Sequence, residues 1–215
     1  MSGHEDHVPS RDRLTMNAEL EPIPACTLSC DLEAVIATDL LQTRRSHQID
    51  DAAENRSLSL LGRQLSRSPR NFFQNLAEAT IDLVRVDSAG ISLLTSDKSK
   101  FIWPAVAGSL AHLLGEGTPA DFGPCGTVLD RNAPQLFIRP ERHFTYLETI
   151  RPRIEEGLLV PFYLRGAAVG TIWAIRHSTD HPFDREDLRL LESLSELAAS
   201  AYALLALAGE VPPTD

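Results

Sequence analysis

The chain has 215 residues, of which 43% are hydrophobic, and carries a formal net charge of -10 at pH 7. This length suffices for one domain with a full hydrophobic core and terminal extensions. Because the chain is acidic and has no lysine or arginine cluster, the sequence argues against nucleic acid and anionic membranes as main partners.

The chain has an odd number of cysteines, Cys26, Cys30 and Cys125, and shows no recognisable export signal. We therefore expect free thiols and a reducing, cytoplasmic location. We expect no metal, because Cys26 and Cys30 have no second ligand pair nearby. We also expect no membrane insertion, because Arg165 and Arg176 interrupt the longest apolar stretch.

The N-terminal part of the chain divides into two segments. Residues 1–17 are polar without periodicity, which predicts a disordered tail. Residues 18–67 predict an N-terminal extension with a helix, because leucines recur at helical spacing in 54–65. Ser68 and Pro69 are suited to the cap and first position of the next helix.

A wide apolar helical face from Phe72 to Val84 precedes a run of strands. Residues 89–95 and 101–107 alternate as strands do, and Pro104 within the second indicates an edge position or a bulge. Further along, 126–131 predicts a short helix and 135–138 a short strand. These elements belong to a long, partly irregular segment, 108–156, of the kind that usually carries function.

The C-terminal part is the most regular. Residues 158–177 form two apolar runs around Arg165-Gly166, which predicts a hairpin with a tight turn. Asp184 is suited to the N-cap of a long helix and Asp187 to the third position of its capping box. Gly209 ends the helical pattern.

The order of these elements carries a family resemblance. The second hairpin strand contains Val-Gly-Thr-Ile, and the helix entry from Phe183 reads F-D-x-x-D-L-x-L-L-x-x-L-x-x-x-A. This pattern resembles the C-terminal half of a GAF domain, the small-molecule sensory module of signalling proteins. The resemblance implies an α+β, PAS-related fold at 68–208, followed by a C-terminal tail at 209–215. In this fold an antiparallel sheet of five to six strands carries the N- and C-terminal helices on one face, and loops and short helices on the other.

The resemblance also implies a ligand cavity between the 108–156 segment and the sheet. Alternation on the second hairpin strand separates a Thr-Trp face from a small-residue face, which suits helix packing. We expect an aromatic-lined pocket of about 300 Å³ or more for an unidentified organic molecule. Aromatic residues expected around it include Phe137, Phe144 and Phe162. The candidate ligand-binding residues are Trp103, Phe122, Cys125, His143, Tyr146, Thr171 and Trp173.

Cys125 supports alternative interpretations. The N-terminus of a helix favours a thiolate. Some GAF-like domains attach a linear tetrapyrrole through a cysteine that a histidine follows, but Gly126 follows Cys125. Others reduce oxidised methionine with loop cysteines, a redox role for which Cys26 or Cys30 would be the resolving thiol. A third interpretation is a pure dimerisation module with a filled core. We favour a sensor without enzymatic activity; its cofactor, if any, is unknown from the sequence.

The C-terminal helix also predicts a homodimer. Its apolar residues exceed one stripe, so a second surface should cover them, together with a helix that precedes Val86. Because no kinase, cyclase or DNA-binding motif is present, we expect output through a separate signalling protein. The apolar residues outside the main stripe are Leu190, Ala199, Tyr202, Leu204 and Leu207.

Overall fold

The computed structural model describes residues 30–48, 50–68 and 71–211; the predicted tail and Cys26 lie outside these ranges. The α-helices are α1 (Leu40–Thr43), α2 (Asp51–Arg67), α3 (Phe72–Val84), α4 (Pro124–Arg131) and α5 (Arg185–Ala208). The strands are β1 (Ser88–Leu94), β2 (Lys100–Gly108), β3 (Gly117–Pro119), β4 (Gln135–Ile138), β5 (Glu156–Leu164) and β6 (Ala167–Arg176). Short 3-10 helices are η1 (Leu32–Ala34), η3 (Ala111–Leu113), η4 (Pro140–Arg142) and η5 (Thr145–Thr149).

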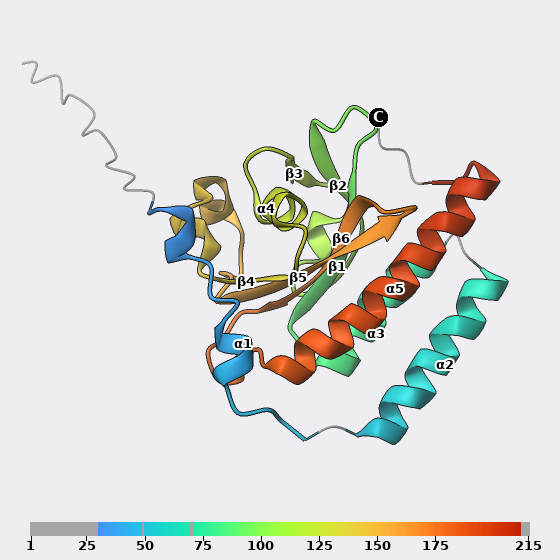
Figure 1. The fold of residues 1–215 in the computed structure, drawn as a ribbon, viewed down its shortest axis with the longest axis horizontal. Helices are drawn as coiled ribbons and strands as arrows, with labels where there is room; N and C mark the ends of the chain where they lie inside the picture. Colours follow the sequence, from blue (N-terminus) through green and yellow to red (C-terminus); the bar gives the residue numbers. More distant parts are fainter. Residues whose placement is uncertain (1–29, 49, 69–70, 212–215) are drawn as a thin grey trace, which may run out of the picture.

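The strands form one antiparallel sheet in the order β3-β2-β1-β6-β5-β4. Helices α3 and α5 pack on one face, and α2 packs against both of them. Helix α4 and the segments around η4 and η5 lie on the other face (Figure 1). This arrangement confirms the predicted α+β architecture, with helices on one face and short, irregular segments on the other.

Alternation along the central strands produces two cores. On β6, Ile172 and Ala174 belong to the helix-side core, whereas Trp173 and Ile175 belong to the core under the irregular segments. The prediction that Phe162 lies at the cavity is wrong. Phe162 is two residues from Val160 on β5, so both side chains lie on the same face of the sheet, toward the helices. Its ring lies 6.4 Å from that of Tyr202 on α5, between centroids.

Two predicted backbone irregularities are present. Arg165 and Gly166 form a two-residue turn with φ of 52° and 82°, the combination that a tight β5–β6 hairpin requires. In the β1–β2 ladder the register shifts between Ile91 and Leu93, and this shift places a bulge at Pro104. Pro104 has no backbone N–H, and at the bulge none is needed for a regular hydrogen bond between β1 and β2.

The helix ends show one confirmed and one wrong prediction. Asp184 and Asp187 form the expected capping box at the start of α5, and Gly209 ends the helix with a φ of 66°. Ser68, however, lies at the C-terminal cap of α2, where its N–H donates to the carbonyl of Gln64 over 2.9 Å. Helix α2 extends further than its leucines indicate, and Asn71 takes the N-cap position of α3.

By length and composition alone, α5 is apolar enough to cross a membrane, with a mean hydropathy of 1.4 over its most apolar window. In the structure, Leu191, Leu194 and Ala198 of this helix are fully buried in the helix-side core. Core helices of soluble proteins often have this composition, so the property is weak evidence for a membrane span.

Candidate functional site

An apolar cavity lies between the sheet and the irregular segments, which we call the roof (residues 108–156). Its volume is about 60 Å³. The residues that line it are Trp103, Leu110, Thr118, Pro124, Cys125, Phe137, Pro140, Leu147, Ile150, Ile154, Gly157, Leu159, Trp173 and Ile175. Three of the candidate ligand-binding residues, Trp103, Cys125 and Trp173, are thus brought together in one wall.

A chain of hydrogen bonds joins α4 to the sheet beside this cavity. The Cys125 thiol donates to Ser92 Oγ over 3.3 Å and accepts from Thr171 Oγ1 over 3.4 Å. The indole Nε1 of Trp173 donates to the same Ser92 oxygen over 3.1 Å. Thr171, another candidate, therefore supports Cys125 and does not itself line the cavity.

Cys125 is buried, with 5% of its surface exposed. Burial raises the pKa of its thiol above the ordinary value, although hydrogen bonds with Ser92 and Thr171 act in the opposite direction. The helix N-terminus, which was expected to favour the thiolate, therefore does not decide the protonation state. The residue is a neutral thiol at pH 7, which disfavours a nucleophilic role.

Two glycines allow the close packing of this wall. A Cβ atom at Gly126 would lie 2.0 Å from the Ala120 carbonyl oxygen, so no side chain fits directly after Cys125. This contact explains why the histidine typical of tetrapyrrole attachment has no place here. A Cβ atom at Gly90 would lie 2.2 Å from the Trp173 ring, so this glycine makes room for the indole.

Three polar atoms near the cavity, one in β2 and two in the roof, are buried without a hydrogen-bond partner among the described residues: Trp103 Nε1, Thr118 Oγ1 and Tyr146 Oη. Trp103 and Thr118 line the cavity, but Tyr146 does not. Burial, together with the nearby Cys125, raises the pKa of the Tyr146 hydroxyl, which therefore remains protonated. These neutral groups lie near the cavity, but the surface of the cavity itself is apolar.

The remaining aromatic candidates lie outside the cavity wall. Phe122 is 41% exposed, and its ring packs against those of His143, Phe144 and Tyr146. His143 Nδ1 donates to the carbonyl of Cys30 over 2.6 Å, so the imidazole connects the roof to the N-terminal segment. These residues form a cluster that supports the roof from outside.

The cavity is smaller than the expected pocket of about 300 Å³. The lining residues that the sequence does not predict are mainly aliphatic, such as Leu110, Ile154 and Leu159, and have no aromatic or polar group that marks them. Leu159 and Ile175 were identifiable, because strand alternation places them on the face opposite to that of Ile172. Nothing in the sequence marks Leu110 or Ile154, which lie in irregular segments.

Residues 30–48, which we call the strap, connect the roof to the helix layer. Next to β4, Ile36 bridges to Phe137, and Ile138 N–H donates to the Val35 carbonyl over 2.8 Å. The strap then passes the edge of the sheet and reaches the N-terminus of α5 (Figure 1). The strap thus connects the roof, on one face of the sheet, with the N-terminus of α5, on the other face.

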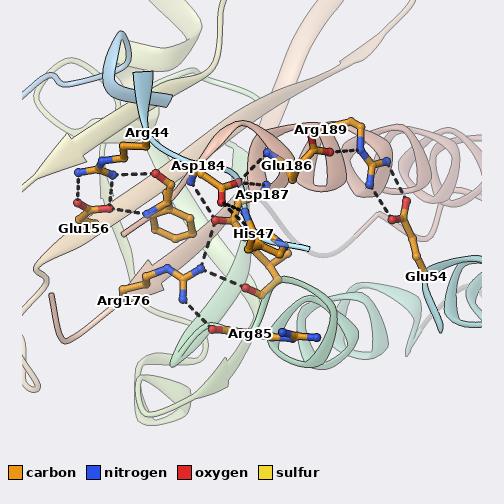
Figure 2. Close-up of polar contacts among 12 residues, drawn as sticks. Arg44, His47, Glu54, Arg85, Glu156, Arg176, Asp184, Glu186, Asp187 and Arg189 are labelled. Carbon is orange, nitrogen blue, oxygen red and sulfur yellow. Dashed lines mark hydrogen bonds and ion pairs between the residues drawn. The ribbon is translucent and has the colours of Figure 1, made fainter. Parts of the chain in front are cut away.

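A polar network fixes the far end of the strap (Figure 2). Arg44 forms a two-pronged ion pair with Glu156, at 2.6 and 3.0 Å, and donates to the Phe183 carbonyl over 2.8 Å. His47 donates from its backbone and from Nδ1 to Asp184, over 2.8 and 2.9 Å. Beyond the strap, Glu54 and Arg189 join α2 to α5.

One group in this network has the composition of a metal site. Ligand atoms of His47, Asp184 and Asp187 lie within 4.8 Å of one another. However, the carboxylate oxygens already accept hydrogen bonds from backbone N–H groups, and the guanidinium of Arg176 lies 3.3 Å from Asp187. Burial raises the pKa of Asp184, but the hydrogen bonds from His47 and from the helix N-terminus outweigh it and lower the pKa overall. We interpret the group as an anchor between strap and helix.

Comparisons with known proteins agree with this geometry. A model of the GAF domain family matches residues 66–203. The GAF domain of an Acinetobacter phosphoenolpyruvate-protein phosphotransferase is 16% identical, with a TM-score of 0.63, over 76% of this chain and 100% of that one. The second GAF domain of DevS from Mycobacterium smegmatis is 19% identical, with a TM-score of 0.55, over 66% and 98%.

A third similar structure is the free methionine-R-sulfoxide reductase from Neisseria meningitidis in complex with its substrate. It is 14% identical, with a TM-score of 0.59, over 77% of this chain and 97% of that one. A search of curated proteins found no match. At these identities the solved structures establish the fold alone.

The fold is an α+β domain of the small-molecule sensing or regulatory type. The match of the family model over more than half of the chain identifies the family: the protein belongs to the GAF domain family.

Proposed function

We propose that this GAF domain is a sensor that binds a small molecule in the roofed cavity and signals through its helix layer. The observation that carries the proposal is the partly enclosed apolar cavity of about 60 Å³, whose lining contains both tryptophans of the chain. A filled core would leave voids of about one water molecule. The ligand would contact Trp103, Trp173 and Cys125, and Thr171 would position the cysteine.

The strap supplies the route to the helix layer. It contacts the roof through Cys30, which donates from its backbone to Arg142 and accepts from His143, and contacts α5 through His47. A ligand that shifts the roof would therefore displace the strap, and with it the N-terminus of α5. The helix layer would pass the change to a second copy of the chain or to a separate signalling protein.

We propose a cytoplasmic homodimer that binds neither nucleic acid nor membrane and has no catalytic activity. The acidic net charge of -10 argues against binding to nucleic acid or to an anionic membrane. The buried, neutral thiol of Cys125 supports the absence of nucleophilic catalysis.

Native mass spectrometry of freshly purified protein, together with its tryptophan emission, tests the sensory proposal. We expect a bound small molecule, and its removal should change the emission, because the two tryptophans line the cavity. Protein without bound mass, whose emission no small molecule changes, would contradict the proposal.

One observation favours a second candidate, a thiol-dependent reductase or redox sensor: Cys125 lines the cavity, as a reacting thiol would. Among the described residues, Cys30 is the other free cysteine and would be the resolving thiol. Turnover of free methionine sulfoxide with a thiol reductant, lost in Cys125→Ala, would establish this alternative. We expect no turnover.

A further inference from the structure

The polar groups of the residues around the cavity do not face it. The indole N–H of Trp173 and the thiol of Cys125 both donate to Ser92 Oγ. Trp103 Nε1 and Thr118 Oγ1 have no hydrogen-bond partner among the described residues, but both atoms are buried and the surface of the cavity is apolar. A molecule in the cavity therefore meets no free side-chain donor or acceptor.

The lining also lacks charge, since none of the side chains that form it is ionisable to a cation or carboxylate. A polar or charged group placed against such a surface loses its hydrogen bonds to water and gains none in return, which is strongly unfavourable. A hydrocarbon group has no such bonds to lose, and its entry removes apolar surface from water. Because the cavity is only partly enclosed, a polar group of the same molecule can remain hydrated at the opening.

Building on the proposed sensory function, we infer that the ligand is an amphipathic molecule, which places a hydrocarbon group in the cavity and keeps its polar group at the opening. The hydrocarbon group lies against the two tryptophan rings and aliphatic residues such as Leu110, Leu159 and Ile175. Its binding energy comes from burial of apolar surface, without a hydrogen bond from a lining side chain. The site therefore rejects a molecule that must bury a hydroxyl or a charge in order to enter.

Unbranched alcohols test the inference on the full chain. Propanol, butanol, pentanol and hexanol, each with a terminal hydroxyl, form a series of growing hydrocarbon length, and hexanediol with a hydroxyl at each end is the matched polar probe. Tryptophan emission gives the affinities, because both tryptophans line the cavity. We expect the affinity to rise by up to about fourfold for each methylene that enters the cavity. Hexanediol should bind at least about fivefold more weakly than hexanol, because one of its hydroxyls has to be buried.

A pair of substitutions of one shape shows whether the alcohols bind in the cavity. Ile175→Val and Ile175→Thr shorten the same lining residue of β6 equally, but only Ile175→Thr adds a hydroxyl. We expect Ile175→Thr to bind hexanol about two- to tenfold more weakly than Ile175→Val, because the added hydroxyl loses its contact with water when the chain enters. Ile172→Val, in the helix-side core on the opposite face of the same strand, is the control and should leave the affinities unchanged.

Methyl resonances of the unaltered protein keep the test valid if Ile175→Thr folds poorly: hexanol should shift those of Leu110 and Leu159, and leave those of Ile172 and Leu191 in the helix-side core unchanged. Hexanediol that binds as tightly as hexanol, equal binding by the two Ile175 variants, or methyl shifts confined to the helix-side core would overturn the inference and leave the sensory proposal standing. So would failure of every alcohol while native mass spectrometry shows another bound molecule. If no alcohol binds and no bound molecule exists, the sensory proposal fails as well.

Discussion

Gly90 determines how closely β1 and the Trp173 indole approach each other. We expect Gly90→Ala to destabilise the protein by about 1–3 kcal/mol and to change tryptophan emission, because the added methyl overlaps the ring. Gly62→Ala on α2 is the matched control, since a Cβ there has no neighbour within 4 Å and alanine favours helix by about 1 kcal/mol. Urea unfolding gives both values. Equal effects of the two substitutions would contradict the assigned contact.

Cys125 should make stability depend on alkaline pH. Its pKa is raised in the folded protein, so its contribution is fully present below the unfolded value of about 8.5 and decreases as pH rises above it. We expect the free energy of unfolding to fall by up to about 1.4 kcal/mol per pH unit above about pH 8.5. Tyr146 adds to this fall only above its own ordinary value of about 10.

The comparison with Cys125→Ala isolates this effect, because the variant should show a flatter pH profile between about 8.5 and 10. Alkylation supplies an independent check: an iodoacetamide probe should label Cys125 more slowly than the half-buried Cys30. Identical pH profiles, or fast selective labelling of Cys125, would show that the thiol ionises readily in the folded protein.

How much of the site the sequence predicts depends on where each residue lies. Trp173 and Thr171 follow from strand alternation, which fixes the face of each side chain, whereas Trp103 is predicted only as an aromatic residue of a strand. Phe122 and His143 were chosen for their chemistry alone, and the structure places them outside the cavity wall. Side-chain directions in the roof depend on backbone angles that no periodicity encodes.

The same distinction applies to secondary structure. The hairpin and α5 have strong local signals: alternation, a glycine-containing turn and a capping box. Strand β3 was missed because its three residues, Gly117–Pro119, are too short to show a pattern and are strand only by pairing with β2. The strap likewise takes its path from distant partners such as Glu156 and Asp184.

Anchoring of the strap should depend on Arg44. Its partner Glu156 is buried, so Arg44→Ala leaves a buried carboxylate without its counter-charge and should cost about 3–5 kcal/mol. Arg189→Ala is the control: Arg189 also forms a two-pronged ion pair, with Glu54, but is more exposed and should cost about 1 kcal/mol or less. Urea unfolding compares the two. Similar losses would mean that the strap end is not anchored by the buried pair.

The two faces of the sheet carry two apolar layers that differ in how completely they are packed. On the helix side, Leu190 is buried within the chain and Tyr202 is half-buried against the helix-side core, although both are predicted to face a partner. On the other face of the sheet, the apolar side chains do not fill the layer completely and line the cavity. Uncovered apolar surface on α5 is thereby reduced to its last turns, which hold Leu204 and Leu207.

The C-terminal end of α5 should accordingly form the dimer contact. Leu204 and Leu207 are 45% and 79% exposed, and a second copy of the chain would cover them. We expect a dimer in sedimentation velocity at micromolar concentration, and Leu204→Glu should weaken it without changing the circular dichroism spectrum. Leu114→Glu is the control, because Leu114 is 55% exposed but belongs to the roof. A monomer at micromolar concentration, or equal weakening by both substitutions, would rule out this end of the helix as the interface.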